Sequence, residues 1–167
     1  MNIFVHRRDL RVNDNTSLIN LEDNIVPIFI FDPLQIDKNK NNYFSNNLVY
    51  FMCESLLELK NEYKKLNGNL QFFYGNYIKI LKDLNKKNKI NSISFNLDYS
   101  PYSKMRDKEI LDFCNENKLE CNLFEDMLLI PLDSERSLIP SSKKPYTVFT
   151  PFMNNLKKYK INKPQNN

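Results

Sequence analysis

Short apolar runs that end in polar or turn-forming residues recur along the chain, a pattern typical of buried strands bounded by turns. The predicted strands cover residues 2–5, 25–31, 70–74, 90–97 and 119–124. Several of these runs show no apolar–polar alternation, so both faces of the sheet must be covered. The second run ends at Asp32-Pro33, where we expect a turn.

Between these runs, apolar residues recur at steps of three and four, the period of an amphipathic helix. The longest such stretch follows a cap at Ser45 or Asn46 and contains Leu48, Phe51, Met52, Ser55, Leu56, Leu59, Tyr63 and Leu66. Further helices are predicted over residues 15–21, 77–84, 102–117 and 146–159. The helix over 102–117 is expected to turn inward Met105, Ile110, Leu111 and Cys114.

This alternation of strands and helices predicts an α/β fold. We expect a Rossmann-like, doubly wound, five-stranded parallel sheet with helices on both faces, because right-handed crossovers leave few other ways to bury such runs. The alternation ends near residue 127. Residues 1–127 are therefore interpreted as the α/β domain, and residues 128–167 as a closing loop, a terminal helix and the start of a linker.

Composition narrows the class of protein. With 167 residues, 41% hydrophobic and 13% aromatic, the chain is expected to fold as one domain. No apolar run is long enough to span a membrane, and no signal peptide is expected. Three cysteines and one histidine predict neither a disulfide framework nor a metal site, which indicates an intracellular, reducing compartment such as the cytoplasm or nucleus.

Several chemistries are excluded by residues that the chain lacks. Its two glycines, Gly68 and Gly75, permit neither a dinucleotide-binding glycine motif nor a phosphate-binding Walker loop. The only histidine, His6, lies at the end of the first predicted strand, where a packed core residue is expected rather than a general base. We therefore expect no self-contained active site.

Polar segments follow four of the predicted strands: residues 6–11, 32–33, 75–76 and 98–102. In a parallel sheet these segments converge on one edge, where ligands bind. The first segment places Arg7, Arg8 and Arg11 around Asp9. Such guanidinium groups can hold a phosphate or carboxylate, or can lock a loop through Asp9, and the residues alone favour loop locking.

The residues from Val5 to Asn15, VHRRDLRVNDN, resemble the opening motif of the DNA photolyase and cryptochrome family. Further resemblances follow in the same order along the chain: residues 25–33 to the second strand, 51–59 to a long helix, Pro101-Tyr102 with Arg106-Asp107 to the next crossover, and 146–152 to the closing segment. They extend from Met1 to about Leu156, nearly the whole chain.

The resemblance implies a chromophore pocket. In this family the N-terminal α/β domain often holds a light-harvesting antenna, and a larger helical domain carries the FAD. The positions that would form the antenna pocket are Arg8, Asp9, Leu10, Phe31, Asp32, Asp98 and Tyr102. Folate-binding members often have Asn and Glu where this chain has Tyr102 and Ser103, so a deazaflavin or flavin antenna is expected instead of folate. FAD is expected only through a separate domain.

The resemblance also implies a function. We expect the N-terminal, antenna-bearing part of a split or truncated deoxyribodipyrimidine photolyase, which is not catalytic alone and serves light-driven DNA repair with a FAD-binding helical domain on another chain. The surface expected to contact that domain contains Tyr146, Phe149, Phe152 and Met153. The alternatives are a stand-alone nucleotide- or chromophore-binding module, or a cryptochrome-like interaction protein without repair activity.

Weak contact with DNA is the remaining expectation. The net charge of +4 suits a nucleic acid neighbour, although a solvated lysine surface explains it equally well. Salt-sensitive, sequence-independent association would rest on the lysines near the carboxyl end: Lys143, Lys144, Lys157, Lys158, Lys160 and Lys163.

Overall fold

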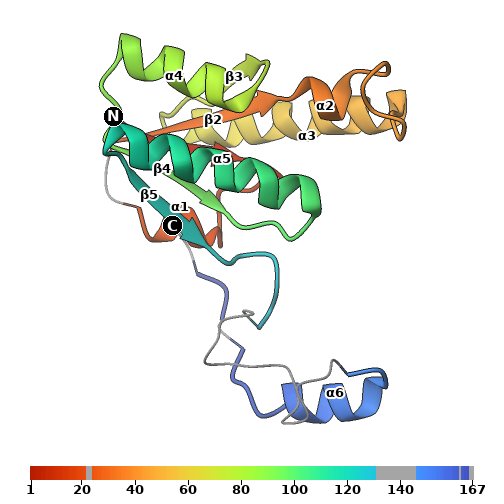
Figure 1. Ribbon diagram of the computed structural model, residues 1–167. Coiled ribbons are helices and arrows are strands. Elements are labelled where there is room, and N and C mark those ends of the chain that lie inside the picture. The colour runs from red at the N-terminus through yellow and green to blue at the C-terminus, as the bar shows by residue number, and fades with distance from the viewer. Residues whose placement is uncertain (22–23, 131–145, 162, 166–167) are drawn as a thin grey trace.

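A five-stranded, all-parallel sheet forms the centre of the computed structural model, which describes residues 1–21, 24–130, 146–161 and 163–165 (Figure 1). The spatial order is β3-β2-β1-β4-β5. The strands are β1 (Asn2–His6), β2 (Ile25–Phe31), β3 (Gln71–Tyr74), β4 (Ser92–Asn96) and β5 (Glu120–Phe124). The strands β2 and β3 are added on one side of β1, and β4 and β5 are added on its other side, so the strand order switches between β1 and β4. The crevice expected to receive ligands lies at the ends of these two strands.

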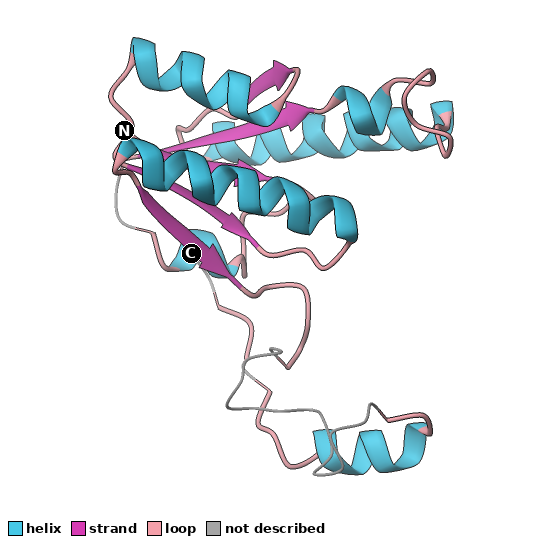
Figure 2. Ribbon diagram, viewed as in Figure 1, coloured by secondary structure: helices cyan, strands magenta, loops and turns pink. Residues whose placement is uncertain are grey.

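Helices cover both faces of this sheet, as the sequence predicts (Figure 2). On one face, α4 (Tyr77–Lys87) and α5 (Pro101–Asn117) pack on a core that includes Ile3, Ile28, Leu81, Ile93 and Ile110. On the other face, α1 (Thr16–Ile19) and α3 (Asn46–Lys65) cover a second core, which includes Val12, Phe29, Leu56, Leu59 and Leu70. The doubly wound fold is therefore confirmed.

The turn predicted at Asp32-Pro33 is instead a short helix, α2 (Pro33–Ile36). The Asp32 carboxylate accepts a hydrogen bond from the backbone N–H of Leu34 at 2.8 Å, and Pro33 occupies the first helical position, where its missing N–H costs nothing. The local residues therefore encode a helix start as well as a turn. This single helical turn leads the chain away from the end of β2.

The inward face of α5 differs from the predicted one. Met105 was expected to be buried but is 50% exposed, whereas Ile110 and Cys114 are buried as predicted. Arg106 and Asp107 lie inward instead. Their burial could not be read from apolar periodicity, because both side chains are charged.

The helix predicted over residues 146–159 is shorter, spanning α6 (Phe149–Leu156). It lies apart from the sheet and buries none of its residues (Figure 1). The boundary placed at residue 127 stays a prediction. Within the described residues, no helix combines the length and the apolar content that crossing a membrane requires.

His6 is fully buried at the end of β1, as the sequence predicts. Its Nε2 lies 2.6 Å from the Tyr63 hydroxyl, and its Nδ1 lies 3.1 Å from the backbone oxygen of Asp9. Burial lowers the pKa of His6, against the opposing charge of Asp9. The neutral imidazole is thus part of the packing between β1 and α3.

We expect the protein to lose stability as the pH falls below 6.5, the ordinary pKa of histidine. Because the folded pKa is lowered, the unfolded chain binds the proton first, and the free energy of unfolding falls by up to about 1.4 kcal/mol per pH unit. Urea denaturation between pH 5 and pH 8 measures this slope.

His6 is the only histidine in the chain, so His6→Gln, which keeps hydrogen-bonding capacity but does not titrate, should flatten the slope near pH 6. An unchanged slope in this variant would contradict the assignment.

Candidate functional site

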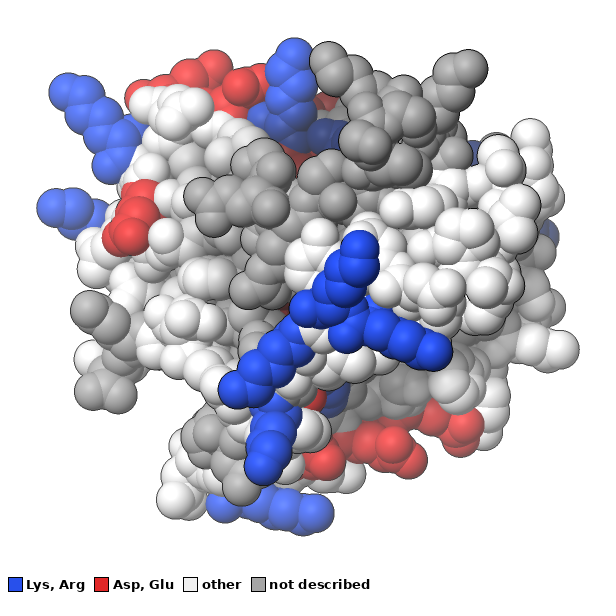
Figure 3. Space-filling model, turned by 90° about the horizontal axis from the view of Figure 1, so that it is seen from below, with Lys and Arg blue, Asp and Glu red and all other residues white. Residues whose placement is uncertain are grey.

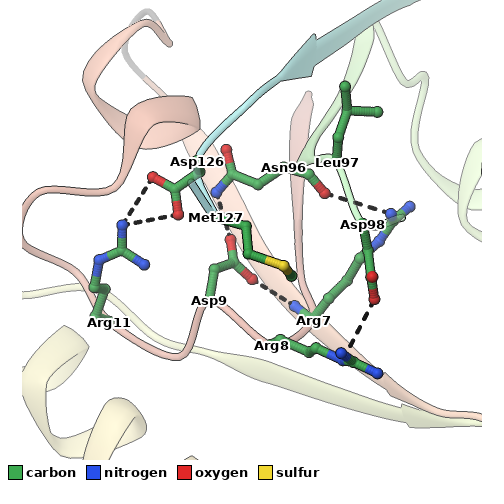
Figure 4. A pocket seen from close by; sticks show the side chains of 9 residues that line it. All are labelled: Arg7, Arg8, Asp9, Arg11, Asn96, Leu97, Asp98, Asp126 and Met127. Atoms are coloured by element: carbon green, nitrogen blue, oxygen red, sulfur yellow. Dashed lines mark hydrogen bonds and ion pairs between the residues drawn. The ribbon is translucent and has the colours of Figure 1, made fainter. Parts of the chain in front are cut away.

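Two cavities open where the parallel strands end. The first has a volume of about 250 Å³ and lies between the segment after β1, the end of β4 and residues 126–127 (Figure 4). The second, of about 370 Å³, lies between the ends of β1 and β2 and the helices α2 and α3. Arg7, Arg8 and Asp98 line both cavities.

Asp9 organises the first cavity. Its carboxylate accepts hydrogen bonds from the backbone N–H of Arg7 at 2.8 Å and from the side-chain amides of Asn96 at 2.6 Å and Asn15 at 3.3 Å. Figure 4 shows Asp9 and Asn96 pointing toward each other across the crevice. These contacts satisfy the carboxylate within the protein, as the loop-locking interpretation requires.

A second carboxylate, that of Asp126, closes the other side of the first cavity. Both of its oxygens accept hydrogen bonds from Arg11 Nη2 at 2.8 Å. Its Oδ1 also accepts hydrogen bonds from the backbone N–H and the hydroxyl of Thr16, at 2.9 and 2.8 Å. The segment that follows β5 is thereby tied to the start of α1. The carboxylates of Asp9 and Asp126 are both occupied by the chain's own donors, so the first cavity is a poor candidate for ligand binding.

The ion pair between Arg8 and Asp98 separates the two cavities, with Arg8 Nε 3.3 Å from Asp98 Oδ2. Burial alone would raise the pKa of Asp98, but hydrogen bonds from Ser103 and Ser100 and the charge of Arg8 outweigh burial, so that the pKa is lowered. Asp98 is therefore a carboxylate at neutral pH. The Arg8 side chain is 68% exposed and is free to bend toward a ligand.

Beneath this pair lies a buried cluster in which Asp107 binds two guanidinium groups. Arg7 Nη1 is 2.7 Å and Arg106 Nε is 3.3 Å from Asp107 Oδ1. Burial and the neighbouring Arg106 lower the pKa of Arg7 to about 10, so Arg7 remains charged at pH 7. Among the residues that the structure describes, Arg7 Nε and Nη2 and Arg106 Nη2 have no hydrogen-bond partner although they are buried. The cluster therefore holds two positive charges, one negative charge and unused donors.

One wall of the second cavity comes from α3. Its N-terminal half presents Leu48, Val49, Phe51, Met52 and Ser55. The sequence pattern counted Leu48 and Phe51 with the core-facing stripe, yet they are 55% and 69% exposed. The helical stripe therefore continues past the core and becomes one wall of the cavity, which Leu10 and Phe29 also line. Arg7, Arg8, Asp98 and Arg106 supply the charged side chains of the lining.

The structure brings together only some of the residues predicted for an antenna pocket. Arg8, Leu10 and Asp98 line the second cavity. Asp9 lies in the first cavity, and Asp32 accepts a hydrogen bond from the Tyr102 hydroxyl beside the second cavity without lining it. The Phe31 ring packs between Phe29 and Phe72. That any of these residues binds a chromophore stays a prediction.

Arg7, Arg106 and the α3 wall were not among the predicted site residues. The three-and-four periodicity did single out Leu48, Phe51 and Met52, but that signal is the same for a core and for a cavity wall. In the described part of the chain, no group of three or more histidine, cysteine or acidic side chains could hold a metal ion.

Near the carboxyl end, two of the residues predicted to face a second domain are exposed, and the other two, Tyr146 and Phe152, are half-buried. Phe149 is 71% and Met153 is 38% exposed, and the Tyr146 and Phe152 rings lie 5.8 Å apart. Lys157, Lys158, Lys160 and Lys163 are exposed nearby. Seen from the side of α6, basic side chains gather near the centre of the face (Figure 3). Lys143 and Lys144 lie outside the described residues, and DNA association stays a prediction.

The chain matches the family model described as DNA photolyase over residues 2–166. This chain belongs to the DNA photolyase family. It is 31% identical to the deoxyribodipyrimidine photo-lyase of Buchnera aphidicola subsp. Acyrthosiphon pisum, over 90% of this chain and 32% of that enzyme. It is 30% identical to cryptochrome-1 of Aedes aegypti, over 72% of this chain and 23% of the cryptochrome.

A solved structure shows the same relationship. The archaeal photolyase of Sulfolobus tokodaii, described as holding two FAD molecules and as implicating a novel light-harvesting cofactor, superposes with a TM-score of 0.84 at 38% identity. The match covers 99% of this chain and 37% of that one. The photolyase-family chain described here thus spans about a third or less of the two curated relatives, and its α/β fold is that of photolyase N-terminal domains.

A substitution that removes one buried charge tests the Arg7 cluster. Asp107→Asn should lower the free energy of unfolding by about 3–5 kcal/mol, because two buried guanidinium groups lose the carboxylate that they share. Asp98→Asn is the matched control, whose partner Arg8 is largely exposed, and should cost about 1 kcal/mol or less. Urea denaturation of both variants compares the two losses. Equal losses would contradict the described charge cluster.

Proposed function

We propose that this chain is the antenna-bearing α/β half of a photolyase-type flavoprotein and that it binds a planar chromophore of the flavin or deazaflavin class in the second cavity. The observation that carries the proposal is the N-terminal half of α3, whose apolar side chains continue the core stripe into an open cavity wall. Apolar side chains left beside a cavity, with polar groups converging at one end, are typical of a small-molecule site.

The residues fit such a chromophore. The cavity, at about 370 Å³, lies within the usual range of ligand pockets, which is roughly 300–1,000 Å³. Leu48, Phe51 and Met52 offer an apolar surface to a flat ring. The unused donors of Arg7 and Arg106, with the exposed Arg8, suit the carbonyl and phosphate oxygens of a flavin, and the Asp98 carboxylate suits a ring N–H.

The contacts of Tyr102 and Ser103 support a flavin or deazaflavin over a folate. The Tyr102 hydroxyl donates a hydrogen bond to Asp32, and burial together with that contact raises the pKa of Tyr102. The Ser103 hydroxyl donates a hydrogen bond of 2.8 Å to Asp98. Both side chains that occupy the pterin-binding positions of folate-using relatives are therefore engaged within the protein.

When bound, the chromophore would absorb light and pass the excitation to a second cofactor. The chain's own part is to hold the ring against α3, to orient its polar edge toward the arginines and Asp98, and to exclude water from the apolar wall. That the FAD performing DNA repair is held by a separate helical domain stays a prediction, and repair would be an activity of the two domains together.

The contact with that helical domain would use the exposed side chains of α6 and its approach. Phe149 and Met153 lie on a helix that buries none of its residues, so a partner can cover them without unfolding the α/β domain. In the split-enzyme form of the proposal, the partner domain is on another chain.

A cryptochrome-like protein without repair activity is the second candidate, because the chain is also 30% identical to the Aedes aegypti cryptochrome. Both candidates share the chromophore cavity. They differ in whether the protein, combined with its helical domain, splits pyrimidine dimers in light, so a repair assay on the combined protein distinguishes them.

The purified chain should bind FMN, measured by quenching of flavin fluorescence, and should bind methenyltetrahydrofolate more weakly. Val49→Phe fills part of the cavity and should weaken flavin binding at least about tenfold, because the flat ring loses its place against α3. Val148→Phe, a matched substitution outside the cavity, should leave the affinity unchanged.

Preferred binding of the folate, or equal flavin affinity in Val49→Phe and in the unchanged chain, would contradict the proposed chromophore site.

Co-expression with the FAD-binding helical domain of a photolyase tests the α6 surface. The two polypeptides should co-purify, and Phe149→Asp with Phe152→Asp should abolish this because two charges would be buried at an apolar interface. Tyr43→Asp, at a position that is 90% exposed, serves as the control and should keep the complex intact. A complex that survives the double substitution would overturn this part of the proposal.

A further inference from the structure

The two edges of the sheet are protected differently. At one edge, β5 begins with Glu120 and is in contact with α1 and α5. At the other edge, β3 pairs with β2 and with no other strand of the described ranges, and its four residues, Gln71–Tyr74, include neither a charge nor a proline. An edge strand without charges, prolines or a cover leaves backbone N–H and C=O groups open to pairing with another strand.

An apolar groove of about 260 Å³ adjoins this open edge. It is lined by Phe31, Cys53, Leu56, Leu57, Lys60 and Phe72. Leu57 is 59%, Phe72 is 38% and the adjoining Tyr74 is 66% exposed. The Lys60 ammonium lies 5.4 Å from the centre of the Phe72 ring. We call β3 together with the exposed α3 residues Tyr50, Cys53 and Leu57 and the half-buried Lys60 the β3 edge surface.

We propose that the β3 edge surface binds a second copy of this chain, with the two β3 strands antiparallel about a two-fold axis. The strand is self-complementary in this arrangement. When Phe73 lies opposite its own counterpart, Phe72 lies opposite Tyr74 of the second copy on the face that carries α3. Aromatic pairs directly across antiparallel strands stabilise a sheet.

The charges along α3 favour the same occupant. In an antiparallel pair of α3 helices centred on Leu57, residues equally far before and after Leu57 come to the same level. Lys60 is then level with Glu54 of the second copy, and Lys64 is level with the exposed ring of Tyr50. Opposite charges, and a cation beside an aromatic ring, thus meet across the two-fold axis.

The β3 edge surface is separate from the proposed chromophore site. None of the six residues of the groove lines the second cavity. Phe31, which the family resemblance assigned to the antenna pocket, lines this groove. Self-association can therefore fail or succeed independently of flavin binding.

Sedimentation velocity of the full chain from about 1 to about 200 μM should show a concentration-dependent shift from the 20.0 kDa monomer to a dimer. Leu57→Glu places two like charges at the two-fold axis and should raise the dimer dissociation constant at least about tenfold. Met105→Glu, which adds the same charge at an exposed apolar position of α5, should dimerise like the unchanged chain.

Lys60→Glu should also weaken the dimer, and adding Glu54→Lys to it should restore the dimer by exchanging the two charges. Circular dichroism checks that each variant is folded. A chain that stays monomeric at the highest concentration, or equal dissociation constants for Leu57→Glu and Met105→Glu, would overturn the proposal, as would failure of the charge exchange to restore association.

Discussion

The ion pair between Arg7 and Asp107 connects the central strand to the helix that follows β4, and the end of the sheet where the two cavities open depends on it. The Arg7 guanidinium lies 3.8 Å from the centre of the Phe95 ring and contacts Asp107 at 2.7 Å. Burial raises the pKa of Asp107 and lowers that of Arg7, which shows that desolvation opposes both charges. Such a pair is costly unless geometry and packing hold it, so it restricts the arrangements that β1 and α5 can adopt.

This constraint also explains the character of the second cavity. One carboxylate serves two guanidinium groups, so donors of Arg7 and Arg106 stay without a partner in the described structure. Unused buried donors are unfavourable in a free protein and become favourable when a ligand supplies acceptor oxygens. The apolar residues of α3 complement them at the other side, because they give a flat ring a surface that water covers poorly. The second cavity thus combines an electropositive end with an apolar wall.

Much of this arrangement could be predicted from sequence, for identifiable reasons. The strands are apolar on both sides and the helices carry clear periods, so element order and the doubly wound fold followed directly. The convergence of Arg8, Leu10 and Asp98 followed from the rule that strand ends meet at one edge. The inward turn of Arg106 and Asp107 did not, because charged residues on a helix are normally expected to face water. Leu48 and Phe51 were assigned to the core, since spacing alone does not distinguish a core from a cavity wall.

The order of strands separates the surfaces proposed for partners. The β3 edge surface is at one end of the order β3-β2-β1-β4-β5, whereas the chain leaves the sheet toward α6 from β5 at the other end (Figure 1). A second copy on β3 and a helical domain on α6 therefore do not compete for the same edge. The second cavity lies closer to the β3 end of the sheet than to the β5 end. The helix α3 contributes one set of residues to the wall of this cavity and another set to the β3 edge surface. In the proposed dimer, α3 would meet its counterpart across the two-fold axis, and the same helix would be restricted by a bound chromophore. If the two events are coupled, linkage requires that chromophore binding changes the affinity of self-association by the same factor as self-association changes the affinity for the chromophore.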